Sequence, residues 1–406
     1  RMVTKMKVLI FAAVAVFCVQ SVFTVDTHEH NKVVCYWNTT AFERQGPGKF
    51  QLDDVQSALS LCTHLIYGFA GINAETFEVV PLKPSLDTGV GYSYYKLVTQ
   101  LKRTFPNLKI YLGIGGNADP DDETHKYLVL TETSQSRSKF INSVNRLLND
   151  YDFDGIDLAW QFPPAKDDKE VEHRDGFTIL VRDLKAQLRP RLKDLTIGVL
   201  PHDIYSNNIK RFDRIDEIIH FSSLLRREIV GAQYRCRPPV HFRSKDTVSK
   251  IGRSIDSVSR YWLEHGTPGS KIVVGIPTYA RTWKLTSESQ ISGVPPIVTD
   301  GPGAEGPHTN TPGLLSYAEV CSRLTESAVG RLRRVGDPSK KYGSYAYQPY
   351  NENTGADGIW VGYEDPDTAG NKAAYAKAKG LGGVAIYDLS LDDFRGVCTG
   401  DKYPII

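Results

Sequence analysis

Eight short apolar segments recur along the chain, and longer stretches with helical patterning lie between most of them. This alternation is typical of a parallel sheet, because each parallel strand needs a crossover helix to bring the chain back. The segment Ile272–Ile276 is apolar on both faces, as a strand covered by helices must be. Eight such units favour an α/β fold of the closed (β/α)8 type, a TIM barrel, over an open sheet. The expected strands are Val33–Trp37, His64–Phe69, Lys109–Ile114, Gly155–Leu158, Leu195–Leu200, Glu217–Ser222, Ile272–Ile276 and Gly383–Tyr387.

One interval breaks this rhythm. About a hundred residues separate Ile276 from Gly383, which is too many for a single crossover helix. The interval is rich in Tyr and Trp, with Gly and Pro between them, as in a small antiparallel sheet. We therefore expect a barrel domain over residues 31–406, with a small α+β domain at residues 280–368 inserted after the seventh strand.

The N-terminus has the pattern of a secretory signal. Lys5 and Lys7 precede an apolar run, Val8–Val19, that is too short to span a bilayer. We predict a signal peptide at residues 1–21 and a secreted, extracellular protein with no membrane span; a membrane anchor or a buried helix is the alternative. The chain has 49 Lys and Arg against 47 Asp and Glu. Such a balanced charge gives no global field for nucleic acid.

Cysteines and a glycosylation sequon agree with export. Cys18 would leave with the signal peptide, and the remaining five cysteines are an odd number, so one should be unpaired or linked to another chain. A single acceptor sequon for N-linked glycosylation is present at Asn38, followed by Thr39 and Thr40.

The fourth expected strand carries the most specific motif. The run from Phe153 to Pro163 reads FDGIDLAWQFP, and it resembles the signature D-G-x-D-x-D-W-E-[YF]-P of glycoside hydrolase family 18, the chitinase family. Further segments resemble the family's first, second, third and eighth strands in the right order: Cys35–Trp37, Cys62–Ala70, Leu112–Gly116 and Gly382–Phe394. The resemblance covers nearly the whole chain beyond the signal peptide, and it implies the same barrel.

The family's chemistry needs side chains that this motif lacks. Family 18 enzymes hydrolyse β-1,4-linked N-acetylglucosamine with help from the substrate's acetamido group, using one Glu as general acid and an Asp two residues earlier. The Glu position holds Gln161, and an amide has no titratable proton near neutral pH. The Asp position holds Ala159. Asp154 and Asp157 remain, but we expect a degenerate site without hydrolase activity. Replacement of the acid by another carboxylate is the alternative.

Sugar-contacting positions have also changed. By alignment, Ser223 and Leu224 replace the family's Tyr-Asp pair after strand six, Asn117 replaces an aromatic residue after strand three, and Tyr387 replaces the Trp beneath the central sugar. Four aromatic residues remain as glycan-binding candidates, together with Gln161. Each aromatic side chain is equally well explained as part of the packing inside the barrel. The aromatic candidates are Tyr36, Phe69, Trp160 and Tyr387.

Within the family, the pattern of these changes resembles that of insect imaginal disc growth factors. Gln and Ala in the catalytic motif, together with the ending Asp388–Cys398, resemble these secreted chitinase-like proteins, which promote growth and tissue remodelling without hydrolysis. The resemblance implies disulfides between Cys35 and Cys62 and between Cys321 and Cys398. Cys236 matches nothing in the pattern, so its role stays open.

Three functions compete: a growth-promoting or signalling protein, a lectin that binds chitooligosaccharides without cleaving them, and an active glycosidase. The first is favoured, and its partner would be a cell-surface receptor or glycan. Two basic segments, Arg226–Lys245 and Arg331–Lys341, follow strand ends on the ligand face and suit an anionic polysaccharide; two solvated segments are the alternative. No Cys or His spacing suggests a metal site, and no glycine-rich phosphate loop follows a strand, so we expect no cofactor.

Overall fold

The computed structural model describes residues 31–91, 93–119, 124–159, 170–199, 217–221, 234–235, 255–289, 298–325, 330–335, 344–398 and 400–406. The predicted signal peptide lies outside the described residues. So do the site candidates Trp160 and Gln161, the aligned pair Ser223 and Leu224, and Cys236.

Eight parallel strands form the closed barrel that the sequence predicts. Their order around the sheet is β1-β16-β9-β7-β6-β5-β4-β2, and β1 also pairs with β2, which closes the ring. The strand ends differ from the expected ones by three residues at most. A short strand, β3 (Val79–Pro81), pairs antiparallel with the end of β2. The barrel strands are β1 (Lys32–Asn38), β2 (His64–Ile72), β4 (Lys109–Gly115), β5 (Gly155–Ala159), β6 (Asp194–Val199), β7 (Glu217–Phe221), β9 (Ile272–Pro277) and β16 (Gly383–Tyr387).

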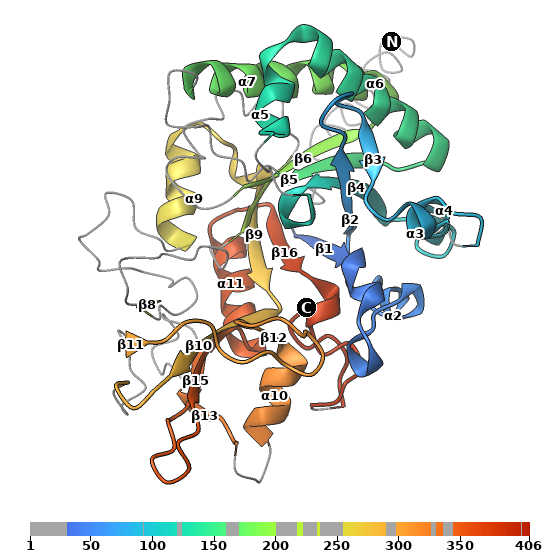
Figure 1. The fold of residues 1–406 in the computed structure, drawn as a ribbon. Coiled ribbons are helices and arrows are strands. Elements are labelled where there is room, and N and C mark those ends of the chain that lie inside the picture. Colours follow the sequence, from blue (N-terminus) through green and yellow to red (C-terminus); the bar gives the residue numbers. More distant parts are fainter. Residues whose placement is uncertain are drawn as a thin grey trace, which may run out of the picture.

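Helices cover the outside of this ring (Figure 1). One of them is α6 (Ser134–Tyr151). The Thr133 side chain before it accepts a hydrogen bond from the Ser136 N–H, and Asp152 after it is in the left-handed conformation. Between these caps its apolar residues recur at helical spacing and face the strands. The described helices are α2 (Leu52–Gln56), α3 (Pro84–Asp87), α4 (Tyr94–Gln100), α5 (Lys126–Glu132), α6 (Ser134–Tyr151), α7 (Glu170–Leu188), α9 (Ile255–Glu264), α10 (Tyr317–Thr325) and α11 (Pro366–Ala378).

The apolar core has two layers, as a barrel requires. The larger layer lies between the strands and the surrounding helices, and it includes Phe140, Leu180 and Trp262. The smaller layer fills the inside of the barrel with alternate residues of its strands. Its buried members are Val34, Tyr36, Ile66, Phe69, Tyr111, Ala159, Val273 and Ala385.

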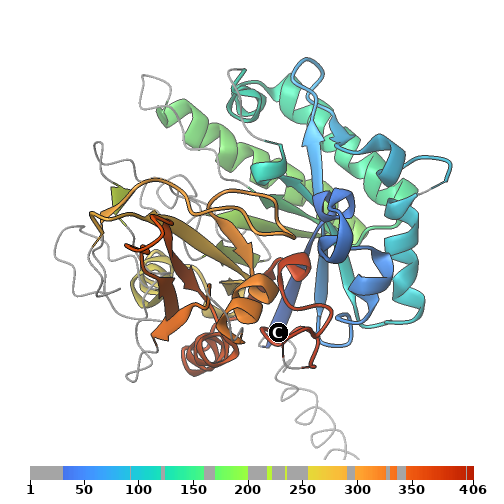
Figure 2. The same ribbon diagram turned by 60° about the horizontal axis from the view of Figure 1, so that its bottom comes forward.

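A five-stranded antiparallel sheet follows β9, in the order β12-β10-β15-β14-β13, and α10 packs beside it. In Figure 2 this sheet stands next to the barrel rather than within it. The chain returns to the barrel through α11, which packs on β9 and β16. The inserted α+β domain predicted after the seventh strand is thus present. Its strands are β10 (Tyr279–Leu285), β12 (Leu314–Ser316), β13 (Arg333–Val335), β14 (Ser344–Gln348) and β15 (Gly358–Tyr363), and a separate pair is formed by β8 (Tyr234–Arg235) and β11 (Val298–Thr299).

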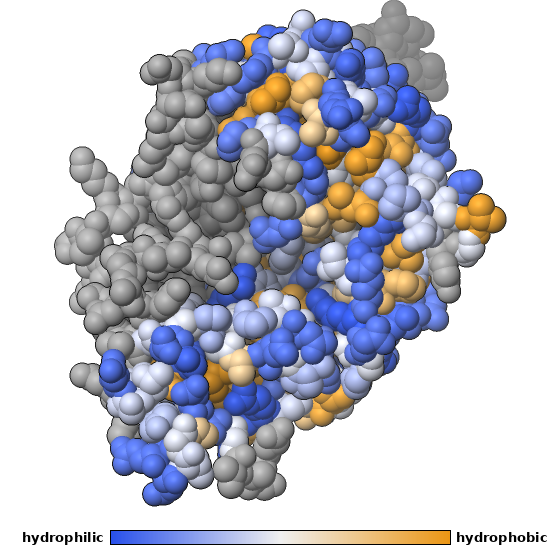
Figure 3. All heavy atoms as spheres, viewed as in Figure 1, coloured by the Kyte–Doolittle hydropathy of each residue, from blue (hydrophilic) through white to orange (hydrophobic). Residues whose placement is uncertain are grey.

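The surface is mixed. In Figure 3 apolar side chains on this face form separate spots among hydrophilic ones. Within the described part of the chain, no helix is long and apolar enough to cross a membrane. The same residues contain no group of three or more His, Cys, Asp or Glu side chains arranged to hold a metal ion.

Candidate functional site

The family-like motif lies on β5, and the structure places its residues at two different levels of the barrel. Asp154 comes directly before the strand, Asp157 lies at its middle and Ala159 is its last residue. In a barrel of this kind ligands bind at the carboxyl ends of the strands. Residues two apart on a strand share a face, so Asp157 and Ala159 both face the inside of the barrel, and Ala159 lies at the ligand end.

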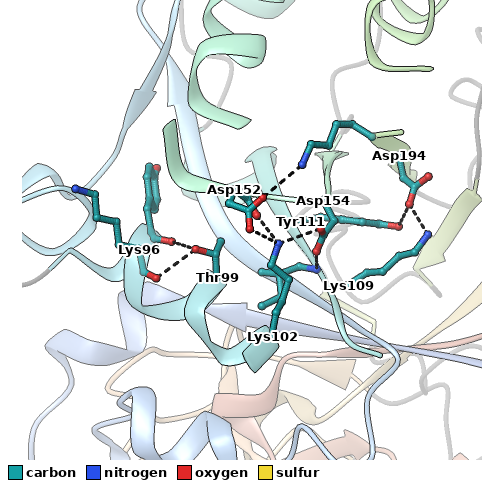
Figure 4. Close-up of polar contacts among 11 residues, drawn as sticks. Lys96, Thr99, Lys102, Lys109, Tyr111, Asp152, Asp154 and Asp194 are labelled. Carbon is teal, nitrogen blue, oxygen red and sulfur yellow. Dashed lines mark hydrogen bonds and ion pairs between the residues drawn. The ribbon is translucent and has the colours of Figure 1, made fainter. Parts of the chain in front are cut away.

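Asp154 belongs to the opposite end of the barrel. One carboxylate oxygen accepts the Ile110 N–H at 2.8 Å, and the other accepts the Lys102 ammonium group at 3.0 Å. Figure 4 shows Lys102 pointing to both Asp152 and Asp154, with a second contact set between Lys109, Tyr111 and Asp194 nearby. Asp154 thus joins strands and a helix at the amino ends of β4 and β5. It has a structural contact there, far along the strand from the ligand end.

Asp157 is fully buried, and hydroxyl groups from two other strands hold its carboxylate. The Tyr36 hydroxyl donates to one oxygen at 3.0 Å, and the Thr196 hydroxyl donates to the other at 2.6 Å. Both contacts use the carboxylate as an acceptor. This arrangement fixes the side chain inside the barrel, between β1 and β6.

Ala159 packs against a glycine turn at the end of β4. Gly115 and Gly116 both have positive φ, at +93° and +68°, which glycine adopts without strain. A Cβ atom added to Gly116 would lie 3.2 Å from the Cβ of Ala159, so the two residues are in close contact. Asn117 follows this turn and is exposed, at the position where the family resemblance leads one to expect an aromatic side chain.

Three of the four aromatic candidates gather at this end of the barrel. Ring centroids of Tyr36 and Tyr387 are 5.1 Å apart, and those of Tyr36 and Phe69 are 6.3 Å apart. Tyr36 and Phe69 are buried, whereas Tyr387 is partly exposed. Of these three, Tyr387 is the residue with exposed surface, and the rings of the other two lie beside its ring. Burial raises the pKa of Tyr387 well above its usual range, so its hydroxyl stays a neutral donor and acceptor.

The inserted sheet adds a further aromatic and a cation to the same place. Tyr279 and Arg281 stand two residues apart at the start of β10, and the Arg281 guanidinium lies 5.4 Å from the centre of the Tyr279 ring. The Tyr279 ring is in turn 6.5 Å from that of Tyr387. Sequence analysis did not single out these two residues. The sequence signal that could have found them is an aromatic and a cationic residue two positions apart, directly after the seventh strand.

A buried polar network behind the glycine turn was also missed. Asp119 accepts the Ile72 N–H at 3.0 Å, the Tyr127 hydroxyl at 2.6 Å and the Lys126 ammonium group at 2.5 Å. A buried Lys is rare, and its sequence neighbourhood looks like an ordinary helix start. The network ties α5 and the end of β4 to β2. It thereby fixes the segment that carries Gly115 and Gly116.

Two disulfides are present among the described residues. Cys35 on β1 is bonded to Cys62, two residues before β2, and Cys321 on α10 is bonded to Cys398. These are the pairs that the family resemblance implies. Both oxygens of Asp393 accept backbone N–H groups, from Val397 at 2.9 Å and Cys398 at 2.8 Å, which sets the turn into the second disulfide.

The C-terminal segment continues across the loop after β1. Tyr403 donates its hydroxyl to the Asp54 carbonyl at 2.6 Å, and Arg44 donates to the Ser390 carbonyl at 3.0 Å. Its aromatic contacts are also close, since Phe394 meets Phe50 with centroids 4.8 Å apart. The last residues thus link the inserted domain to the first βα unit.

Comparison with known families decides the classification. The model of the glycosyl hydrolases family 18 matches residues 32–392, which is the whole barrel with its inserted domain. The chain belongs to family 18. The family resemblance inferred from the motifs is therefore confirmed.

Curated family 18 relatives include insect chitinase-like proteins. Bacteria-responsive protein 1 of Aedes aegypti is 44% identical, with 92% of this chain and 93% of that protein covered. Chitinase-like protein Idgf4 of Glossina morsitans morsitans is 40% identical, with 98% and 97% covered. Imaginal disk growth factor 6 of Drosophila melanogaster is 37% identical, with 92% and 91% covered.

Solved family 18 structures share the fold. The Group IV chitinase of Ostrinia furnacalis in complex with allosamidin has a TM-score of 0.80 at 27% identity, with 92% of this chain and 96% of that chain covered. Human YKL-39, described as a pseudo-chitinase with retained chitooligosaccharide binding properties, has a TM-score of 0.73 at 27% identity, with 92% and 97% covered. Active and inactive relatives thus stand on one architecture, so the side chains at the site must decide the function.

Proposed function

We propose that this family 18 chain is a secreted, catalytically inactive chitinase-like protein that promotes growth and tissue remodelling by binding a cell-surface partner. One observation carries the proposal: Ala159 is buried at the ligand end of β5, where the family's acid-orienting Asp would stand. Gln161, two residues further, has an amide in place of the general acid. Losing a general acid alone costs on the order of 10²–10⁴-fold in rate.

Asp157 is a poor substitute for the missing acid. Its side chain has no exposed surface, and both of its oxygens accept hydroxyl hydrogen bonds from Tyr36 and Thr196. A general acid must present a proton to the leaving oxygen of the substrate. The names of the curated relatives, chitinase-like proteins and imaginal disk growth factors, support the growth-promoting part of the proposal. The predicted signal peptide supports secretion.

A hydrolysis assay paired with a growth assay tests this function. Purified protein from insect-cell medium should release no product from a fluorogenic chitooligosaccharide above buffer, and it should stimulate proliferation of cultured insect cells in a dose-dependent way. Heat-denatured protein is the control for the growth effect. Hydrolysis that Asp157→Asn abolishes would refute the inactive assignment, and secreted protein without any effect on cells would refute the growth-promoting one.

Chitooligosaccharide binding without cleavage is the second candidate. It is favoured by the partly exposed Tyr387, which rests on Tyr36 beside Phe69 and has Tyr279 and Arg281 near its edge. An aromatic ring of this kind can contact the C–H face of a sugar, while Arg281 can donate hydrogen bonds. Calorimetric titration with tetra-N-acetylchitotetraose separates the candidates. Binding by wild type that is lost in Tyr387→Ala would support a lectin. If wild type does not bind the tetrasaccharide, only the growth-promoting role remains.

A further inference from the structure

The acceptor sequon lies at the ligand end of the barrel. Asn38 is the last residue of β1, and it pairs in register with Gly68, the residue before Phe69. The following Thr39 donates its hydroxyl to the Gly68 carbonyl at 2.9 Å, which fastens the sequon to the end of β2. β1 also pairs with β16, the strand that ends at Tyr387. Asn38 is thus placed between the two strands that carry the aromatic candidates.

Strand geometry brings Asn38 close to the aromatic cluster. Tyr36 and Asn38 are two residues apart, so they share a strand face, and their Cα atoms are about 7 Å apart along the strand. Tyr36 is the residue whose ring lies 5.1 Å from that of Tyr387. A group attached to Asn38 would therefore start close to the aromatic cluster that contains Tyr387.

The local conformation leaves the modifiable atom out of the turn. The Asn38 Oδ1 atom accepts the Thr40 N–H at 3.1 Å and the Thr40 hydroxyl at 2.8 Å. Both contacts use Oδ1, so the Nδ2 atom takes no part in them. Asn38 is half-buried, and Thr40 is exposed. A substituent on Nδ2 would thus leave both hydrogen bonds of this turn in place.

From these positions we propose that Asn38 carries an N-linked glycan, and that this glycan covers the mouth of the barrel and restricts the entry of other sugars. The proposal rests on the secretion proposed above. In the modification, Nδ2 forms a bond to C1 of a lipid-diphosphate-linked oligosaccharide; the C1–O bond to the diphosphate breaks, and Nδ2 loses a proton. The first two sugars of such a glycan are β-1,4-linked N-acetylglucosamines. They have the same chemistry as the chitooligosaccharide that the second candidate function concerns.

The test compares two substitutions at one position. Thr40→Ser keeps both the sequon and the hydroxyl, whereas Thr40→Val keeps the shape and removes the sequon. Asn38→Gln is a second sequon-free variant, in case Thr40→Val folds poorly. All are expressed in insect cells as the full chain and purified from the medium. Peptide mass mapping gives the occupancy of Asn38, and titration with tetra-N-acetylchitotetraose gives the affinity.

We expect wild type and Thr40→Ser to carry the glycan, and the sequon-free variants to bind the tetrasaccharide at least about tenfold more tightly, a difference of about 1.4 kcal/mol. Removal of the glycan from wild type with an N-glycosidase should produce the same gain. Secreted protein with an unmodified Asn38 would overturn this proposal alone. Equal affinities, or no binding by any form, would overturn the restriction of entry. A chain retained unmodified inside the cells would overturn the proposed secretion as well.

Discussion

At the scale of single residues, Asp157 and Ala159 on β5 differ in their roles. Asp157 is retained with its hydroxyl donors Tyr36 and Thr196, so the inside of the barrel keeps a fixed carboxylate. Ala159, two residues closer to the mouth, has no polar group and packs on Gly116. A polar side chain at position 159 is therefore not needed for the barrel to fold. The Asp157 carboxylate is needed more, because its removal would leave two buried hydroxyl groups without this acceptor.

Restoring the two motif residues should not restore an enzyme. We expect the variant Gln161→Glu with Ala159→Asp to fold and to hydrolyse a fluorogenic chitooligosaccharide within about tenfold of the background rate. Misplacing the reacting group by about 1 Å can cost 10²-fold. By alignment, Ser223 and Leu224 lack the clamp for the acetamide, and Asn117 lacks a ring.

The same double variant with Asp157→Asn controls for contaminating chitinase. Turnover at ~1 s⁻¹ or more, a rate typical of working enzymes, would show that the sugar site is intact. The lectin would then become the stronger candidate function.

A second residue-scale prediction concerns Asp392. Burial raises the pKa of this carboxyl to about 7, against the opposing effect of the Asp393 and Ile405 N–H groups. The folded state then holds a proton more tightly than the unfolded state. The stabilising contribution is complete below about pH 4 and is lost as the pH rises through about 7. We expect the free energy of unfolding of wild type relative to Asp392→Asn to fall by up to about 4 kcal/mol between pH 4 and pH 8.

Urea denaturation of both proteins at a series of pH values measures this difference. Burial lowers the pKa of His64 to about 3, so His64 has the opposite effect on wild type between about pH 3 and pH 6.5. Taking the difference between the two proteins cancels it. A difference that does not change with pH would mean that Asp392 is no more easily protonated in the folded chain.

At the scale of elements, the sequence predicted the barrel strands better than the residues that act between them. Strands such as Gly383–Tyr387 were identified because apolar runs bounded by helical patterning have few other interpretations. The polar contacts could not be seen in this way. Asp154 shares a motif with Asp157, yet its partner Lys102 is a helix-flanking residue about fifty positions earlier, and only the fold brings the two together. The contact of Asp119 with Lys126 could not be predicted either, because nothing in the local sequence pattern indicates that these two charged side chains are buried together.

The two disulfides should contribute unequally to stability. The cysteines are separated by 27 residues in the pair Cys35–Cys62 and by 77 in the pair Cys321–Cys398. Loop-closure entropy of the unfolded chain then predicts about 3.5 and 4.5 kcal/mol. We expect Cys321→Ser with Cys398→Ser to lower the free energy of unfolding by more than Cys35→Ser with Cys62→Ser does. Chemical denaturation of the two double variants compares them, and the reverse order would show that native-state strain dominates.

At the scale of the whole molecule, charge bears on partners. The chain is nearly balanced overall, with a formal charge of +2, so any binding to an anionic polysaccharide must come from a local cluster. On β13, Arg334 is paired with Asp365 at 2.6 Å. The neighbouring Arg331 and Arg333 are exposed. The larger basic segment, Arg226–Lys245, is outside the described residues except for β8, so the inserted domain offers the sharper test.

We expect the protein to be retained on a heparin column at low salt and to elute between about 0.1 and 0.5 M salt, because exposed charges are screened over that range. Arg331→Glu with Arg333→Glu should elute earlier, while Arg334→Gln, which removes a paired charge, should change elution less. Lack of retention at low salt would return these arginines to the role of solvated surface residues.

The closure of the ring also has a consequence for how the chain is made. The last barrel strand, β16, fills the gap between β1 and β9, so the seam of the barrel joins residues 32–38 to residues 383–387. During translation both flanking strands must wait with unpaired edges until residue 387 has left the ribosome, and such edges are templates for aggregation. The Cys35–Cys62 bond can form early on the nascent chain, whereas Cys321–Cys398 must wait until residue 398 has been made. A premature stop codon shortly before β16 would therefore leave an open sheet and a substrate for chaperones and proteolysis, instead of a slightly shortened protein.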